Sequence, residues 1–185
     1  MKAVTMAAAL DAGVVTPEST YYDAGTRTID KQIISNFDGK ARGRIPLPQI
    51  LLQSLNLGAV HLMEQLGRER FREYLRAFGL EEKTNIELPG EVRGNLKNME
   101  SERLVEYATA SFGQGIAVTP VAAVRAFSAI ANGGVLVDPF VVDEIRTRDG
   151  KVLRERTLGV TRRVIKEETA RAVTRMLVAL VDEKL

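Results

Sequence analysis

Aromatic and aliphatic residues follow a helical period near the middle of this 185-residue chain. Four of them lie at i, i+3, i+4 and i+7, on one face of an α-helix: Phe71, Tyr74, Leu75 and Phe78. Gly79 follows directly and is typical of a helix C-terminus. A stripe of this kind more often packs into a core than binds an aromatic ligand. We therefore expect a core helix that ends at Gly79.

Similar patterns predict further helices on both sides of this one. They are expected at Met1 to Ala12, Gln49 to Gln53, Leu57 to Leu66, Ser101 to about Ala110, Pro120 to about Asn132, and from Lys166 onwards. Ser101 and Thr119 are of the type that caps helix N-termini, so each is expected to cap the helix that follows it.

Two of these helices carry apolar residues that we expect to face the core. In the helix after Thr119 they are Val121, Val124 and Phe127. In the last helix they are Val173, Met176, Leu177, Leu180 and Val181.

Short strands are predicted between the helices. In residues 20–44, β-branched and aromatic residues are interrupted by residues typical of turns: Asp23, Gly25, Asn36, Asp38 and Gly39. Residues 135–154 also alternate, and Asp149-Gly150 is typical of a hairpin turn. The chain is therefore predicted to be a helix-rich α+β domain with small β inserts.

Composition excludes several classes of function. Lys and Arg total 26 and Asp and Glu total 24, and the two signs are interspersed, so no basic face is available for a nucleic acid. Cysteine is absent and His61 is the one histidine, which excludes disulfides and a multi-histidine or thiolate metal site. His61 is expected to pack as a structural residue. No stretch approaches the roughly 20 apolar residues of a membrane-spanning helix.

Ser54-Leu55-Asn56 is the first segment with chemical character. Between two helices, a Ser-x-Asn segment can present a hydroxyl that relays a proton and a carboxamide that binds a substrate amide. Capping of the following helix explains Ser54 and Asn56 equally well, and both interpretations remain open at this point.

The surrounding sequence resembles a known family. Ser54-Leu55-Asn56-Leu57-Gly58 opens an apolar helix, and Leu88-Pro89-Gly90-Glu91 follows later. The segment 111–120, Ser-Phe-Gly-Gln-Gly-Ile-Ala-Val-Thr-Pro, is more specific. Together they resemble the transpeptidase domain of class B penicillin-binding proteins, which share a fold with serine β-lactamases. The division-type members look closest and the elongation type second.

The resemblance assigns the family's three motifs, Ser-x-x-Lys, Ser-x-Asn and Lys-(Thr/Ser)-Gly, to the chain. Lys2 takes the lysine position of the first motif and Ser54 and Asn56 form the second. The nucleophilic serine is expected before Met1 and the third motif beyond Leu185, so residues 1–185 would be part of a transpeptidase domain. Lys83 is expected to be an exposed loop residue rather than part of the third motif; Lys2 on its own would be an ordinary surface lysine.

Phe112 and Gln114 are expected beside the substrate cleft, because the family's Phe-Gly-Gln-Gly turn lies there. The alternative is that Gly113 and Gly115 supply backbone freedom and Gln114 is structural.

The resemblance further implies a peptidoglycan D,D-transpeptidase that forms a serine acyl-enzyme, with Lys2 as base, Ser54 as proton relay and Asn56 as substrate ligand. Its substrate would be the D-Ala-D-Ala end of a stem peptide, and β-lactams would acylate it. No metal or organic cofactor is implied. Partners would be cell-wall or division proteins, at the outer face of the cytoplasmic membrane, with an N-terminal anchoring helix.

Two other function classes remain open. One is a non-catalytic binding or scaffold domain of the same fold. The other is a β-lactamase or β-lactam sensor, against which the Leu-Pro-Gly-Glu and Phe-Gly-Gln-Gly segments argue.

Overall fold

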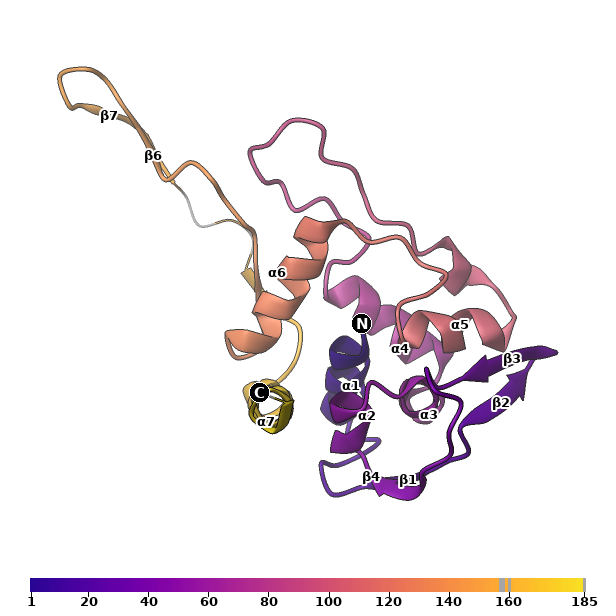
Figure 1. Cartoon of the computed structure of the whole chain (residues 1–185). Helices are drawn as coiled ribbons and strands as arrows, with labels where there is room; N and C mark the ends of the chain where they lie inside the picture. The colour runs from indigo at the N-terminus through magenta and orange to yellow at the C-terminus, as the bar shows by residue number, and fades with distance from the viewer. Residues whose placement is uncertain (157–158, 160, 185) are drawn as a thin grey trace.

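The computed structural model describes residues 1–156, 159 and 161–184. Its helices are α1 (Lys2–Asp11), α2 (Pro48–Leu52), α3 (Asn56–Leu66), α4 (Arg68–Ala77), α5 (Leu104–Ser111), α6 (Pro120–Ala131) and α7 (Glu167–Lys184), with a 3-10 turn, η1 (Lys97–Glu100). The helices form the body of the molecule, from which a two-stranded arm projects (Figure 1). The predicted helices are confirmed, each within a few residues of its expected ends.

The strands are short and pair only two at a time in the described residues. They are β1 (Thr20–Asp23), β2 (Thr26–Ile29), β3 (Gln32–Ser35), β4 (Gly43–Pro46), β5 (Val135–Val137), β6 (Glu144–Arg146), β7 (Val152–Glu155) and β8 (Thr161–Arg163). The antiparallel pairs are β1–β4, β2–β3, β5–β8 and β6–β7, the last forming the projecting arm. Asp149-Gly150 lies in the β6–β7 turn as predicted, and the α+β class with small β inserts is confirmed.

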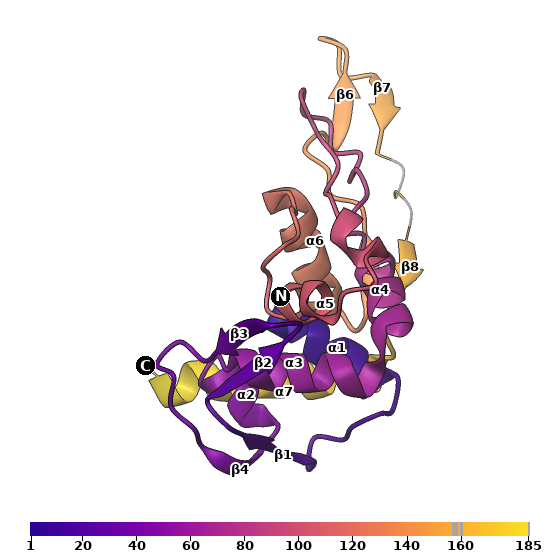
Figure 2. The same ribbon diagram turned by 90° about the vertical axis from the view of Figure 1, so that its right-hand side faces the viewer.

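The centre of the body is α1. Its residues 3–9 are all buried, so neighbouring elements cover the helix on every side. Most of these side chains are alanine, which lets the neighbouring helices approach closely. The helix packs against α3, α4, α6 and α7, and it lies with α3 and α7 in the lower body of the molecule in Figure 2. The first residue of α1 is therefore held by a buried element.

The inward face of α6 differs from the predicted one. Val124 is 66% exposed and Phe127 is 42% exposed. The buried face instead carries Ala122, Ala126, Ala129, Ile130 and Arg125. The Arg125 guanidinium lies 2.7 Å from the Asp138 carboxylate, just after β5. The prediction for Val124 and Phe127 is wrong because close packing of small residues and a buried ion pair fix this face.

Of the two predicted N-terminal caps, the structure contains one. Thr119 Oγ1 accepts a hydrogen bond from Ala122 N (3.2 Å) and caps α6 as predicted. Ser101 does not cap α5: its Oγ accepts from Arg103 N, before the helix begins. The second residue of α5, Val105, instead donates to the Asp30 carboxylate from the β2–β3 turn (2.8 Å).

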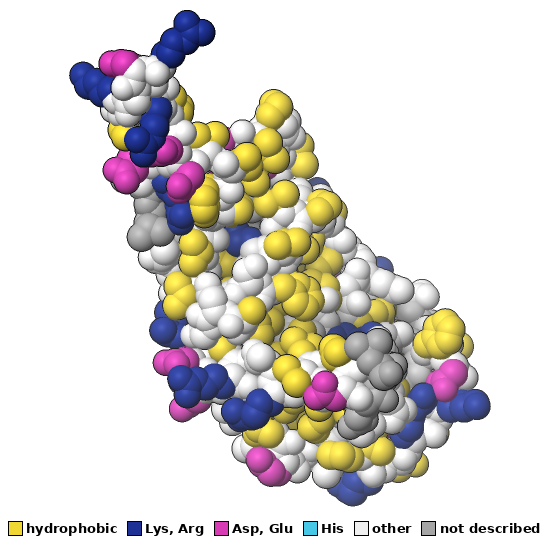
Figure 3. Space-filling model, turned by 60° about the vertical axis from the view of Figure 1, so that its left-hand side comes forward, with side chains coloured by type: hydrophobic (Ala, Val, Ile, Leu, Met, Phe, Trp, Pro, Cys, Tyr) yellow, Lys and Arg dark blue, Asp and Glu magenta, His cyan; other side chains and the backbone are white. Residues whose placement is uncertain are grey.

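The apolar face of α7 is buried only along part of its length. Val173 and Met176 are buried and Leu177 is half-buried, as predicted, whereas Val181 is 47% exposed. An 18-residue helix extends beyond the shorter α1, α2 and α6 that pack on it, which leaves Val181 uncovered. Hydrophobic side chains gather on the face turned to the viewer in Figure 3. Val124, Phe127 and Leu177 line an open groove of about 460 Å³ between α6 and α7.

Within the described ranges, no helix is both long and apolar enough to span a membrane.

Candidate active site

Lys2 and Ser54 meet at the start of α1. Lys2 Nζ donates a hydrogen bond to Ser54 Oγ at 3.0 Å, across 52 positions of sequence. Lys2 is half-buried, and this burial lowers the pKa of its amine below the ordinary value of 10.5, because desolvation disfavours the charged form. Lys2 therefore makes a specific side-chain contact with the Ser54-Leu55-Asn56 segment.

Ser54 has an unusual backbone conformation. Its φ is +54°, in the left-handed region that costs a non-glycine residue about 1–2 kcal/mol. The residue lies in the tight link between α2 and α3, where Leu55 is buried and donates from its backbone N to Ile50 O (2.9 Å). Strain of this kind persists only where the surrounding structure fixes it. In this conformation the hydroxyl reaches Lys2.

Asn56 is the first residue of α3. The N-cap position is taken by Leu55, whose side chain cannot accept a hydrogen bond, so the interpretation of Ser54 and Asn56 as side-chain caps is wrong. Asn56 Nδ2 donates instead to Ser35 O at the end of β3 (2.9 Å). The carboxamide is thus oriented by the β2–β3 hairpin.

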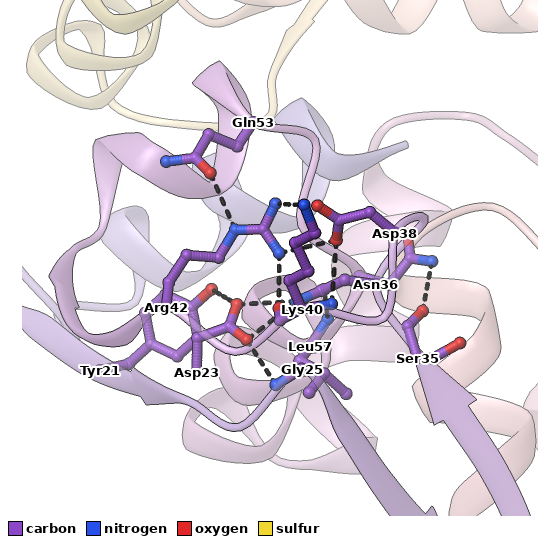
Figure 4. Close-up of polar contacts among 11 residues, drawn as sticks. Tyr21, Asp23, Gly25, Ser35, Asn36, Asp38, Lys40, Arg42, Gln53 and Leu57 are labelled. Carbon is purple, nitrogen blue, oxygen red and sulfur yellow. Dashed lines mark hydrogen bonds and ion pairs between the residues drawn. The ribbon is translucent and has the colours of Figure 1, made fainter.

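A buried polar network around Asp23 and Asn36 reaches the start of α3 at Leu57 (Figure 4). Asp23 is 0% exposed and Asn36 is 2% exposed. Asn36 Nδ2 donates to both carboxylate oxygens of Asp23 at 2.8 and 2.9 Å, and Leu57 N in α3 donates to Asn36 Oδ1 at 3.2 Å. Both residues are predicted to lie in turns: Asn36 does open a turn, because Gly39 N donates to Asn36 O at 3.0 Å, whereas Asp23 ends β1. Contrary to the usual exposure of turn residues, the side chains of Asp23 and Asn36 are buried.

An open groove of about 400 Å³ runs beside Asn56. Phe112 and Gln114 also line it, so the structure brings these three predicted site residues together. Ile33 and Phe37 form part of the remaining wall, and Phe37 is fully exposed. Lys2 and Ser54 are not part of this lining; Leu55 connects them in sequence to Asn56.

The turn that carries Phe112 and Gln114 is attached to α1. Thr5 is fully buried and its Oγ1 donates to Ser111 O at 2.7 Å. Gly113 and Gly115 have φ values of +99° and +73°, which confirms that this turn needs their backbone freedom. Gln114 is exposed beside them and lines the groove. No sequence pattern indicated the role of Thr5.

Other polar residues lie away from this arrangement. His61 is half-buried and stacks on Tyr21 with ring centroids 5.4 Å apart, which confirms a structural role. Lys83 is exposed in a loop, as predicted. Glu91 of the Leu-Pro-Gly-Glu segment accepts hydrogen bonds from Thr84 and Asn85 and so fixes that loop. No cluster of His, Cys, Asp or Glu suited to a metal occurs among the residues that the structure covers.

A lysine amine hydrogen-bonded to the serine of a Ser-x-Asn segment is the kind of pairing found in serine acyltransferases with Ser-x-x-Lys and Ser-x-Asn motifs. Residues 1–184 match the profile of the penicillin binding protein transpeptidase domain, and the chain belongs to this family. The predicted family is therefore confirmed, and the β-lactamase, sensor and scaffold alternatives are not favoured.

Individual relatives agree with this assignment. The chain is 35% identical over 184 residues to "Stage V sporulation protein D" of Bacillus subtilis, and 33% identical over 184 residues to "Penicillin-binding protein PbpB" of Mycolicibacterium smegmatis. Each match covers 98% of this chain but 28% of the relative. The chain therefore spans little more than a quarter of these proteins.

Solved structures share the fold. Penicillin binding protein 3 from Mycobacterium tuberculosis, complexed with aztreonam, superposes with a TM-score of 0.89 at 28% identity, covering 97% of this chain and 40% of that one. A peptidoglycan synthetase from Bifidobacterium adolescentis gives 0.91 at 27% identity, covering 99% of this chain and 34% of that one.

Proposed function

We propose that this chain is part of a peptidoglycan D,D-transpeptidase that cross-links stem peptides through a serine acyl-enzyme. The observation that carries the proposal is the hydrogen bond from Lys2 to Ser54, immediately before Asn56 and its groove. Curated relatives include "Peptidoglycan D,D-transpeptidase FtsI homolog" of Chlorokybus atmophyticus, 32% identical over 154 residues.

Lys2 acts as the base that activates the nucleophile. A serine hydroxyl is a weak nucleophile until a neighbouring group takes its proton. The lowered pKa of Lys2 makes the neutral amine available at a lower pH than for an exposed lysine. By resemblance the nucleophilic serine stands three residues before Lys2, one helical turn away, and the third motif follows α7. Residues 1–185 are then a partial transpeptidase domain.

Ser54 relays the proton and Asn56 binds the substrate. Ser54 Oγ accepts from Lys2 Nζ and can donate its own proton to the leaving amine. Ser35 O holds one Nδ2 hydrogen of Asn56, so Oδ1 and the other hydrogen are the groups offered to a substrate amide. Ser54 thus serves proton transfer and Asn56 serves substrate binding.

The groove binds the D-Ala-D-Ala end of the stem peptide. Phe112 supplies an apolar wall and Gln114 an exposed carboxamide; the two residues flank Gly113 in the sequence. The acyl-enzyme forms as D-alanine leaves, and an amine of a second stem peptide then takes the acyl group. No metal or organic cofactor is needed for either step. β-Lactams mimic the dipeptide and acylate the same serine, and structures of penicillin binding protein 3 carry aztreonam or ampicillin.

The enzyme works at the outer face of the bacterial cytoplasmic membrane, where its substrate lies, with an N-terminal helix as anchor. Its partners are proteins of the cell-wall or division machinery.

A turnover assay with the complete gene product tests this proposal. It measures D-alanine release and cross-linked product from a synthetic D-Ala-D-Ala stem peptide with an amine acceptor. We expect turnover by the natural sequence and a loss of about a hundredfold or more in Lys2→Ala, because general-base contributions are typically of that size. A Lys83→Ala control, which changes an exposed loop lysine, should leave turnover unchanged. Absence of turnover, or equal turnover in Lys2→Ala, contradicts the proposal.

A further inference from the structure

The β2–β3 hairpin connects the N-termini of two helices. Leu57, the second residue of α3, donates its backbone N–H to Asn36 Oδ1 at 3.2 Å, directly after β3. Val105, the second residue of α5, donates to Asp30 Oδ2 at 2.8 Å, in the hairpin turn. Neither helix has a side-chain cap from its own N-cap residue. The hairpin therefore supplies both caps.

The orientation of Asn36 is fixed by chemistry. A carboxylate can only accept hydrogen bonds, so the Asn36 NH₂ group must face Asp23 and its Oδ1 must face Leu57. Asp23 also accepts from Gly25 N (2.7 Å) and from the Tyr21 hydroxyl (2.9 Å). Because Asp23 and Asn36 are almost fully buried, solvent cannot replace any of these partners.

The same strand end also holds the Asn56 side chain. Ser35 O accepts from Asn56 Nδ2 at 2.9 Å, and Asn36 follows it in sequence. Two adjacent hairpin residues thus hold the backbone and the side chain at the start of α3. Ser54 and Asn56 lie within three residues of Leu57, so a shift of this helix end moves both.

We propose that Asn36, held by Asp23, is a positioning residue for the Ser54-Leu55-Asn56 segment, an inference that rests on the proposed acyl-transfer function. Asn36 lines the groove, but both Nδ2 hydrogens are donated to Asp23 and its Oδ1 accepts from Leu57, so its carboxamide is committed to holding α3 rather than to a substrate. It fixes where α3 begins and so the distance from Ser54 to Lys2 and the approach of Asn56 to the substrate.

The test compares variants of the complete gene product by their maximal rate of acylation with a fluorescent penicillin. The rate is taken at saturating penicillin, per folded molecule, well below each melting temperature. Asn36→Leu keeps a similar volume and removes both hydrogen-bonding groups. A misplacement of the order of 1 Å costs up to about a hundredfold, so we expect a loss of about tenfold or more. Thr119→Val removes the side-chain cap of α6 and should lower the melting temperature while leaving this rate unchanged.

If Asn36→Leu does not fold, a less disruptive pair of variants tests the positioning role. Tyr21→Phe and Tyr74→Phe each remove one hydroxyl that donates to a carboxylate, at 2.9 Å to Asp23 and at 2.8 Å to Asp11. We expect a loss of about threefold or more in Tyr21→Phe only. If the natural protein is acylated and neither Asn36→Leu nor Tyr21→Phe slows acylation per folded molecule, the positioning role is overturned. If the natural protein is not acylated at all, the proposed function itself fails and the inference with it.

Discussion

Replacing Gly58 with alanine adds one methyl group to the closest contact behind the Ser-x-Asn segment. A Cβ at Gly58 would lie 2.4 Å from Ile50 Cγ1 and 2.8 Å from the Tyr21 hydroxyl oxygen. The nearer atom must retreat by roughly 1 Å to reach van der Waals contact, and Ile50 is fully buried. Gly58 is therefore required for the packing of α2 and β1 on α3.

The magnitude follows from two opposing effects. Overpacking lowers the free energy of unfolding by about 1–3 kcal/mol, whereas replacement of a helical glycine by alanine raises it by about 0.5–1 kcal/mol. We expect a net destabilisation of about 1–2 kcal/mol. For a domain of this size that lowers the melting temperature by about 2–8 °C. Acylation by penicillin should also slow, because displacement of Tyr21 disturbs its hydrogen bond to Asp23.

Differential scanning calorimetry of the complete gene product measures the change, and a double-mutant cycle identifies its cause. Ile50→Ala removes the atoms that the new methyl group meets. In that background we expect Gly58→Ala to be neutral or stabilising. A Gly58→Ala protein that melts at or above the natural temperature, or an equal cost in both backgrounds, refutes the packing argument.

Three further predictions concern the charged and polar residues. Because burial lowers the pKa of Lys2, the acylation rate should rise with pH along a limb whose midpoint lies below 10.5; a pH–rate profile without this limb contradicts the role of Lys2. Asn56→Ala should slow penicillin acylation about tenfold or more with little change in melting temperature, as stopped-flow and melting measurements can show, whereas unchanged acylation excludes a substrate contact. Arg125→Met removes the buried guanidinium that pairs with Asp138 and should destabilise the protein by about 1–3 kcal/mol in calorimetry, while an unchanged free energy of unfolding contradicts a stabilising pair.

Local sequence was sufficient to predict the helices but not all of their faces. The period of Phe71 to Phe78 and the glycine after it specify α4 without reference to any other element. For α6 the larger apolar residues pointed to the wrong face, since alanines and Arg125 pack inward. The ion-pair partners of Arg125, Asp138 and Glu82, lie in other parts of the chain, so local sequence does not indicate this face.

Some residues of the candidate site were predictable from the sequence and others were not. Lys2, Ser54 and Asn56 were found by resemblance, and the contact between Lys2 and Ser54 agrees with it. The turn prediction holds for Asn36 but not for Asp23, and the burial of both was missed because it depends on hydrogen bonds to residues up to 21 positions away. A positive φ at Ser54 likewise has no local signal in a serine side chain.

The most direct test of the proposed function is the location of a penicillin adduct. The complete gene product is incubated with a penicillin, digested, and its peptides are analysed by mass spectrometry. We predict one penicilloyl group per molecule, on a serine three residues before Lys2, and slower formation of that adduct in Lys2→Ala. An adduct on Ser54 or on any other residue of this chain, or the absence of a covalent adduct, would contradict the proposed lysine-activated serine acyl-enzyme.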